Sequence, residues 1–586
     1  MICSSIFAVM LSIMSSPAEA ETNHEYATRK SKESQQLLRS EIFDRWGELN
    51  TVTPSAGSTS FYQGFLKLSS GNLLWTDSTG TDVTLVDASQ FEPGYGIAKF
   101  LISPDGSKVA YARAFKGQDL RFWDVVTISK EPQTLTKTPI ENRMQGFTWN
   151  STSDGLYYSF WNDKDKVDKG VEPIIEQRFR SLNTAEDKSV FDHGLAENFE
   201  IVDIGGDELL VAYRVLNPAF GIKTTFSMYT GEKQSDGSYR WARAYERNEH
   251  VAVFLGVRNG KAYILSSEAG DKYGIVVVDF LNGGSKDFLF AGREDQVLHT
   301  AELSGDHLIL QYHSIPEQNV SLEIWNLENA DRARYEVADM GLTPFGNLMR
   351  FNFGPGGKTA RSIYSDVFRG NQVLELSLEN MTLRRLSNEK DLDFDFNKVE
   401  QRLVSFTAED GTLLTGRLYS RKGEDPTFAF MRYYGWISIK NAPEQKEVQM
   451  VLELGGAYLT LDMPGGGERG HDWFIKGSRF RHKMIRYISE FSRFTQKELN
   501  LPKERIAAMG RSWGGLTTLI LAANYGDNFG ILNSVVPVID LKDGFFSSWF
   551  GRIAHSDLAP YIDGQGDYIL DDRYYRYVES LSPAHN

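Results

Sequence analysis

The stretch that decides the fold is Gly510-Arg511-Ser512-Trp513-Gly514-Gly515, which has the pattern G-x-S-x-G. The run 505–509 before it is largely apolar and has the length of a strand, and the apolar run 516–523 after it is typical of a buried helix. Glycines permit a sharp turn from strand to helix, and such a turn lifts a serine hydroxyl above the edge of a sheet. The pattern predicts a nucleophilic Ser512 at a strand-to-helix elbow. An ordinary glycine-rich turn is the alternative.

The residues around this elbow, 400–586, alternate between strand-like and helix-like segments. Two apolar runs, 403–407 and 413–419, flank an Asp-Gly turn and predict a β-hairpin. Apolar residues at helical spacing predict a helix over 476–499. Further buried strands are expected at 427–433, 457–462 and 531–538. Alternation of this kind predicts an α/β-hydrolase domain with a mostly parallel, doubly wound sheet.

Residues 58–399 have a different character, because short β-rich runs are separated there by turns rich in Gly, Asp, Asn and Ser. The segment Ser103-Pro104-Asp105-Gly106 followed by the strand-like run 107–112 is typical. Turns of this type recur roughly every 45–50 residues, which is the period of four-stranded propeller blades. The region therefore predicts a β-propeller of about seven blades. A stack of unrelated β-sandwiches is the alternative.

The N-terminus predicts export. A short apolar run, 6–11, precedes Ala18-Glu19-Ala20, so residues 1–20 are expected to be a signal peptide that is cleaved after Ala20. The mature chain would then be periplasmic or secreted and would lose Cys3, which is its single cysteine. No later apolar run has the length of a membrane span. Residues 21–57 read as an amphipathic helical segment.

Composition excludes several other classes of protein. The chain has 586 residues, too many for one hydrophobic core, and its formal net charge of -15 argues against a nucleic-acid binder and against a peripheral protein of anionic membranes. It contains no Walker loop, no H-E-x-x-H and no cluster with metal-ligand spacing, so we expect neither a cofactor nor a metal ion. The glycine run 465–467 lacks the lysine of a phosphate-binding loop. The oligomeric state is left open.

Five motifs in one order make residues 400–586 similar to the catalytic domain of the prolyl oligopeptidase family of serine peptidases. They are the entry hairpin, Arg432-Tyr433-Tyr434-Gly435-Trp436, Gly465-Gly466-Gly467-Glu468-Arg469-Gly470, the elbow itself and Ser582-Pro583-Ala584-His585-Asn586. The resemblance implies that the propeller caps the active site and that segment 21–57 packs on the hydrolase domain.

The resemblance also implies roles for particular residues. Ser512 would be the nucleophile, and the Trp513 backbone N–H and the Tyr434 hydroxyl would hold the oxyanion. If the alignment with the family's motif is displaced by one residue, Tyr433 would take the role of Tyr434. Trp549 would either stack on a substrate proline or fill the core.

The resemblance places the triad Asp and His after the Ser-Pro-Ala-His-Asn segment, whereas the histidines after Ser512 are His555 and His585. His585 reads as structural, and His555 is a minor candidate for the base. The chain is therefore expected to be a C-terminally truncated form, with an incomplete sheet and little activity.

The sequence thus predicts a serine peptidase that hydrolyses short peptides through an acyl-enzyme on Ser512. Two alternatives stay open. One is an esterase or aminopeptidase-like hydrolase with the same elbow, and the other is a non-catalytic, propeller-based protein that binds peptides.

Overall fold

The computed structural model describes residues 60–537 apart from short internal gaps, of which 162–174, 217–224 and 387–393 are the longest. The expected signal peptide, the helical segment 21–57, Trp549, His555 and His585 lie outside the described residues. No helix among the described residues is long and apolar enough to cross a membrane.

Among the described residues, seven antiparallel sheets follow one another along the first two thirds of the chain. The first three are four-stranded: β1 Ser60–Phe61, β2 Gly64–Ser69, β3 Asn72–Asp77, β4 Asp82–Val86; β5 Tyr95–Ile102, β6 Lys108–Phe115, β7 Leu120–Thr127, β8 Ile140–Arg143; β9 Phe147–Trp149, β10 Gly155–Trp161, β11 Ile175–Ser181, β12 Asp187–Asp192. The next three have the same form: β13 Asn198–Asp203, β14 Leu209–Leu216, β15 Thr225–Lys233, β16 Tyr239–Asn248; β17 Ala252–Arg258, β18 Lys261–Ser266, β19 Gly274–Asp279, β20 Ser285–Phe290; β21 Gln296–Ser304, β22 His307–Ser314, β23 Val320–Asn326, β24 Arg332–Glu336.

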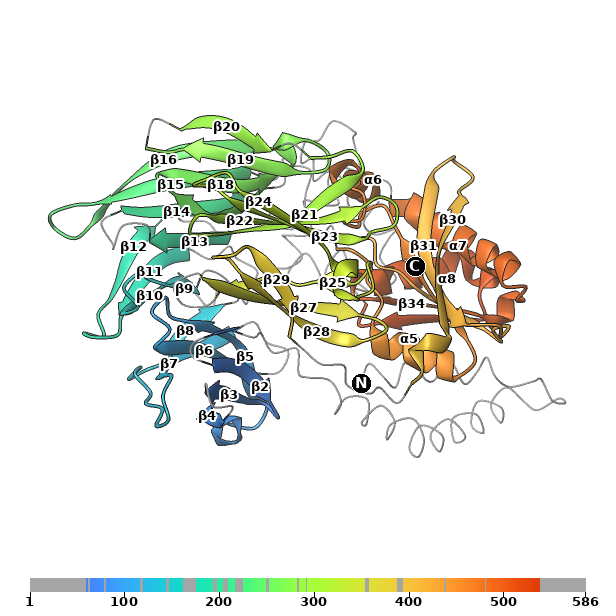
Figure 1. Ribbon diagram of the computed structural model, residues 1–586, viewed down its shortest axis with the longest axis horizontal. Helices are drawn as coiled ribbons and strands as arrows, with labels where there is room; N and C mark the ends of the chain where they lie inside the picture. Colours follow the sequence, from blue (N-terminus) through green and yellow to red (C-terminus); the bar gives the residue numbers. More distant parts are fainter. Residues whose placement is uncertain are drawn as a thin grey trace.

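The last of these sheets has five strands and completes a ring. Its strands are β25 Asn347–Leu348, β26 Asn352–Phe353, β27 Thr359–Asp366, β28 Gly370–Ser377 and β29 Thr382–Arg385. β26 lies against β1 of the first sheet, and the first and last sheets are neighbours in Figure 1. The sheets are therefore the blades of a closed β-propeller, and the expected fold of this region is confirmed.

The turn that pointed to a propeller blade lies between β5 and β6. Asp105 accepts hydrogen bonds from Ser103 Oγ (2.6 Å) and from the Ser107 backbone N–H (2.9 Å), and Gly106 has a φ of 71° that favours glycine. The Asp105 backbone N–H in turn donates to Ser153 Oγ (3.0 Å) in the turn before β10. These turn residues thus close the β5–β6 hairpin and also join the second blade to the third.

The α/β domain, defined here as the described residues from Val399 onward, contains one six-stranded sheet. Its strands are β30 Val399–Thr407, β31 Leu413–Arg421, β32 Ala429–Arg432, β33 Ala457–Asp462, β34 Ile506–Arg511 and β35 Ile531–Val535. They lie in the order β30-β31-β33-β32-β34-β35. β30, β31 and β33 pair antiparallel, while β33, β32, β34 and β35 are parallel to one another. The expected hairpin and the mostly parallel sheet are confirmed.

Helices cover both faces of this sheet. They are α5 Gln445–Glu453, α6 His471–Arg479, α7 Arg481–Glu498 and α8 Trp513–Tyr525. α7 and α8 pack on one face through a core that includes Ile488, Phe491 and Leu521, and α5 packs on the other through Val448 and Val451. Alternate residues of each central strand join opposite cores, as Phe430 and Met431 do. The sheet is therefore doubly wound. Short 3-10 turns complete the described structure at Ala88–Gln90, Ser267–Ala269, Val337–Met340, Phe396–Lys398, Lys503–Arg505 and Gly526–Asn528.

The single helix expected over 476–499 is wrong in its extent, since α6 and α7 are separate helices. The helical spacing that led to it belongs to the buried side of α7. α6 begins earlier, where the His471 backbone N–H donates to the Asp271 carbonyl of the propeller (2.8 Å). A Cβ on Gly477 would lie 2.0 Å from the backbone nitrogen of Gly465, so α6 packs against a loop as well as against other helices.

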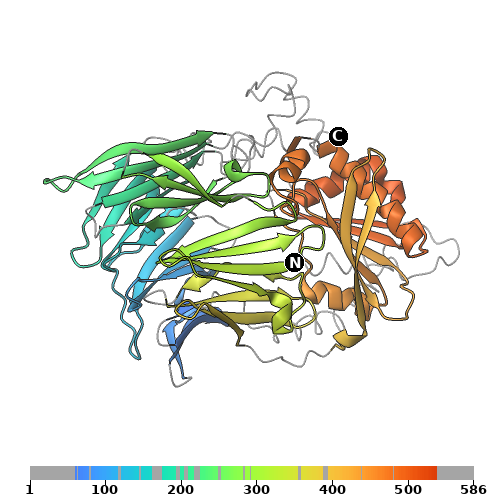
Figure 2. The same cartoon turned by 45° about the horizontal axis from the view of Figure 1, so that its top comes forward.

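The propeller and the α/β domain are in direct contact. The sheets β21–β24 and β25–β29 lie beside the α/β domain in both views (Figure 1, Figure 2). Gln318 Nε2 donates to Asp462 Oδ2 (2.5 Å), and the Asp472 backbone N–H donates to Asp271 Oδ1 (2.6 Å). These contacts put one end of the propeller over the carboxyl ends of the parallel strands, where β34 leads into α8.

Candidate active site

Ser512 occupies a strained position between the end of β34 and the start of α8. Its φ of 56° and ψ of -116° lie in a region that non-glycine residues rarely adopt. Its backbone N–H donates to the Val535 carbonyl (2.8 Å), and its own carbonyl accepts from the Leu516 N–H (3.1 Å). The elbow expected from the sequence is present, with β35 and the first turn of α8 holding the serine in place.

The three glycines of the motif lie in close packing. A Cβ on Gly510 would lie 2.0 Å from the carbonyl oxygen of Gly514, and a Cβ on Gly515 would lie 2.9 Å from that of Val535. A Cβ on Gly514 would lie 3.2 Å from the carbonyl oxygen of Tyr433. Small residues therefore let α8 approach both β34 and the segment after β32.

The two neighbouring tyrosines have different surroundings. The Tyr433 hydroxyl lies 2.8 Å from Thr518 Oγ1 in the core, and burial raises the pKa of this phenol. Tyr434, like Tyr433, lines the same cavity as Ser512, and its Cδ2 atom would lie 3.6 Å from a Cβ built on Gly514. Ser512 and Tyr434 are thus brought together. The alternative position, Tyr433, has its hydroxyl turned to the core.

Trp513 contributes to the elbow in two ways. Its indole is 1% exposed and stacks on Trp436, with ring centroids 4.4 Å apart, so the motif after β32 supports the start of α8. Its backbone N–H belongs to the first turn of α8, where N–H groups have no acceptor within the helix. That position suits an oxyanion donor.

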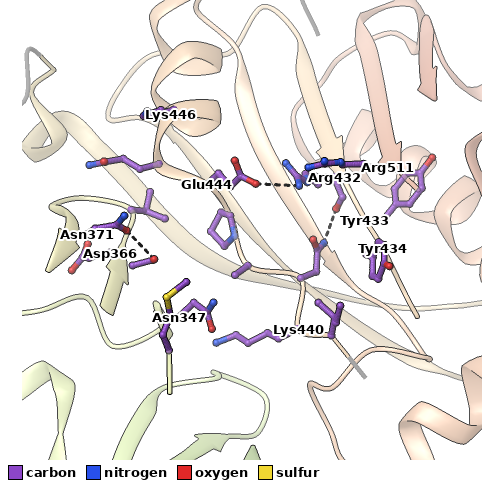
Figure 3. Close-up of a pocket in the computed structure, with 18 of the residues that line it drawn as sticks. Asn347, Asp366, Asn371, Arg432, Tyr433, Tyr434, Lys440, Glu444, Lys446 and Arg511 are labelled. Atoms are coloured by element: carbon purple, nitrogen blue, oxygen red, sulfur yellow. Dashed lines mark hydrogen bonds and ion pairs between the residues drawn. The ribbon is translucent and has the colours of Figure 1, made fainter. Parts of the chain in front are cut away.

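The cavity that Ser512 lines has a volume of about 910 Å³ and lies between the two domains. Asn347, Asp366 and Asn371 of the last blade lie across it from Lys440 and Tyr434 of the α/β domain (Figure 3). A molecule bound beside Ser512 would therefore contact the propeller as well.

Two carboxylates line the cavity among the described residues, and neighbouring groups engage both. Asp366 accepts from the backbone N–H and the hydroxyl of Thr343 (both 2.7 Å) and from the Phe368 N–H (2.7 Å). Glu444 pairs with Arg432 at 3.4 Å, as Figure 3 shows, and Arg432 also forms an ion pair with the buried Glu447. Glu447 accepts in addition from the Tyr458 hydroxyl (2.9 Å). These acids stabilise the walls of the cavity.

A buried polar network adjoins the cavity, and sequence reasoning missed it. Lys440 Nζ donates to the Gly346 carbonyl and lies near His313 Nδ1, each at 3.2 Å, and burial lowers the pKa of this lysine to about 7. Burial and the nearby Asp462 raise the pKa of Glu468 to about 8. No sequence motif marks Lys440, because its partners are far away in the chain.

The described part of the site contains the candidate nucleophile, Ser512, and both candidate oxyanion donors. Among the described residues that line the cavity there is no histidine. His555, His585 and Trp549 fall outside the described residues, so their expected roles stay predictions. In the part of the chain that the structure describes, no group of three or more His, Cys, Asp or Glu side chains could hold a metal ion.

Comparisons with known proteins match both halves of the chain. Residues 18–345 match the family model "Prolyl oligopeptidase, N-terminal beta-propeller domain", and residues 444–586 match the model "Prolyl oligopeptidase family".

Curated relatives include a prolyl endopeptidase of Elizabethkingia meningoseptica, which is 21% identical over 94% of this chain and 76% of its own length. Dipeptidyl aminopeptidase BI of Pseudoxanthomonas mexicana is 23% identical over 79% of this chain. The match covers 63% of the length of that enzyme. Among solved structures, prolyl oligopeptidase B from Galerina marginata, bound to a 25mer macrocyclization substrate, has a TM-score of 0.78 at 16% identity, over 97% of this chain and 83% of that one. At that identity the likeness concerns the fold.

Proposed function

Because the chain belongs to the prolyl oligopeptidase family of serine peptidases, we propose that it hydrolyses short peptides through an acyl-enzyme on Ser512. The observation that carries this proposal is the strained Ser512 at the elbow, which lines one cavity together with Tyr434. A serine held in this way is directed toward a substrate rather than toward the core.

In the proposed reaction Ser512 Oγ attacks the carbonyl carbon of the scissile amide, and its proton passes to a general base. The oxyanion accepts hydrogen bonds from the Trp513 N–H and the Tyr434 hydroxyl. The amine leaves with a proton from the base, and water then hydrolyses the acyl-enzyme. The base and its carboxylate would come from outside the described residues.

The cavity favours an unfolded peptide as the substrate. It is bounded by the last blade as well as by the α/β domain, so a folded protein surface would meet the propeller before it reached Ser512. Prolyl endopeptidases among the relatives support cleavage inside a chain. Capture of a free N-terminal amine, as the name of the aminopeptidase relative suggests, would need a carboxylate, and both carboxylates among the described lining residues are already engaged. We propose in addition that the protein is exported after cleavage behind Ala20.

A serine-directed fluorophosphonate tests the proposal. The natural protein, purified from its source, is treated with the probe beside its Ser512→Ala variant, and the adduct is mapped by mass spectrometry. We expect one adduct, on Ser512, and hydrolysis of peptide amides as well as of activated esters. Turnover of esters alone would favour the esterase. Peptide binding without any adduct would favour the non-catalytic binding protein.

A further inference from the structure

Lys440 is a buried amine that lines the cavity without a carboxylate partner among the described residues. Only 9% of its surface is exposed. Its ammonium contacts the Gly346 carbonyl and His313 Nδ1, each at 3.2 Å, and neither group is an anion. A buried ammonium with neutral partners is unfavourable, because desolvation of the charge is not balanced by an opposite charge.

The nearest acids do not balance this charge. Asp462 is buried and accepts from Gln318 (2.5 Å) and from the Thr415 hydroxyl (2.8 Å). Glu468 accepts from the Asn441 backbone N–H (3.0 Å), and its raised pKa leaves it largely neutral near pH 7. Burial and the positive charge of Arg417 lower the pKa of Lys440 and outweigh Asp462 and Glu468, which act in the opposite direction. An anion beside Lys440 would relieve this imbalance.

The other charged residues that line the cavity also favour a negatively charged ligand. Asp366 and Glu444 are held by backbone groups and by Arg432, as described above. Arg511, next to Ser512, is exposed and adds a further positive charge. A ligand in the cavity therefore meets positively charged side chains, for which a carboxylate is the natural counterpart.

We propose that Lys440 binds a carboxylate of the peptide substrate and so makes acidic peptides the preferred substrates of this site. The inference rests on the proposed function, since it takes the cavity beside Ser512 as the peptide site. A carboxylate replaces a neutral neighbour of the ammonium with an ion pair in a site that excludes water, where charge-assisted hydrogen bonds are strong. Lys440 is a specificity residue in this account, and the chemical step stays with Ser512.

The carboxylate has two possible sources in a peptide, namely an acidic side chain or the C-terminus. Four fluorescent peptides of one sequence separate them: one with an internal glutamate and a C-terminal amide, one with glutamine there and a C-terminal acid, one with both acids and one with neither. Affinities are measured by fluorescence anisotropy on the natural protein carrying Ser512→Ala, so that no peptide is consumed. Protection of wild-type Ser512 from the fluorophosphonate confirms that each peptide occupies the cavity.

We expect at least tenfold tighter binding of one single-acid peptide than of the neutral peptide, which is the usual size of a charge-assisted contact. Lys440→Met should abolish that preference while the neutral peptide binds as before. Lys446→Gln, at a second lysine that lines the cavity, serves as the matched control and should keep most of the preference. If the acidic peptides and the neutral peptide bind the Ser512→Ala protein within twofold, or if Lys440→Met keeps the preference, the inference is wrong.

Two further arms separate the possible failures. If the Lys440→Met protein binds no peptide at all, Lys440→Gln is measured in its place. The affinities of the four peptides for the protein that keeps Lys440 still show whether the site prefers a carboxylate. A carboxylate preference without any fluorophosphonate adduct would support this inference and overturn the proposed catalysis. An adduct on Ser512 with no such preference would do the reverse.

Discussion

Replacement of Gly510 by alanine tests the elbow most sharply, because the required contact is between backbone atoms. The added Cβ would lie 2.0 Å from the Gly514 carbonyl oxygen, 2.4 Å from its carbonyl carbon and 2.6 Å from Thr518 Oγ1. A backbone carbonyl in the first turn of α8 cannot rotate away as a side chain can. The helix must therefore move off β34 and take Ser512 with it.

The size of the effect follows from overpacking, which costs about 1–3 kcal/mol in ordinary cores and more where backbone must shift. We expect the free energy of unfolding of the α/β domain to fall by about 3 kcal/mol. For a domain of this size that is a fall in Tm of roughly 6–12 °C. The fluorophosphonate reaction of Ser512 should fall as well, since the strained backbone would no longer be held.

Gly526→Ala, at the other end of the same helix, is the matched control. No atom lies within 4 Å of a Cβ built on Gly526, and its φ of -53° is helical. That change should leave the free energy of unfolding unaltered or raise it by about 0.4–1 kcal/mol, because alanine lowers the conformational entropy of the unfolded chain. Urea unfolding, followed by tryptophan fluorescence, measures both variants, since Trp436 and Trp513 stack next to the elbow. A Gly510→Ala protein within 0.5 kcal/mol of wild type would refute the packing argument.

Three other changes give separate tests. Tyr434→Phe should slow acylation by roughly 10²–10³-fold with little change in KM, as loss of an oxyanion donor does. Tyr433→Phe should cost about 1 kcal/mol of stability and leave acylation nearly unchanged. Stopped-flow kinetics with an activated ester measures the acylation rate of both variants, and an equal loss in both would contradict the assignment of Tyr434. Burial raises the pKa of Glu468 from 4.5 to about 8, so its contribution to stability is present below pH 4.5 and is lost as the pH rises through 8. In urea titrations, Glu468→Gln should therefore gain stability relative to wild type between pH 5 and 8.5. A difference in stability that does not change with pH would count against this. Glu447→Gln removes the buried partner of Arg432 and should cost about 3 kcal/mol in the same assay, while a cost below 1 kcal/mol would mean that water reaches the arginine.

Local sequence patterns were enough to predict the elbow. The turn depends on Gly510 and on the residues that follow it, all within one short segment, so its requirements are visible in the chain itself. β33 was predicted with its observed bounds, because a run of six buried residues between turns has few other interpretations. Blade turns such as the one at Asp105 were visible for the same reason.

Contacts between distant segments were not predictable from a single sequence. Lys440 contacts His313, which is 127 residues away in the sequence, and Gln318 donates to Asp462, which is 144 residues away. Burial gives these polar side chains their altered pKa values, and nothing in their own neighbourhood signals it. The start of α6 was missed for a related reason, since its first contact is with Asp271 of the propeller.

The most direct test of the central claim is the site of covalent labelling in the natural protein. A fluorophosphonate is added to the purified protein and to its Ser512→Ala variant, and the modified peptide is identified by mass spectrometry. We predict one adduct, on the tryptic peptide that contains Ser512, and none in the variant. An adduct on another residue, or no adduct on a protein with native unfolding behaviour, would contradict it.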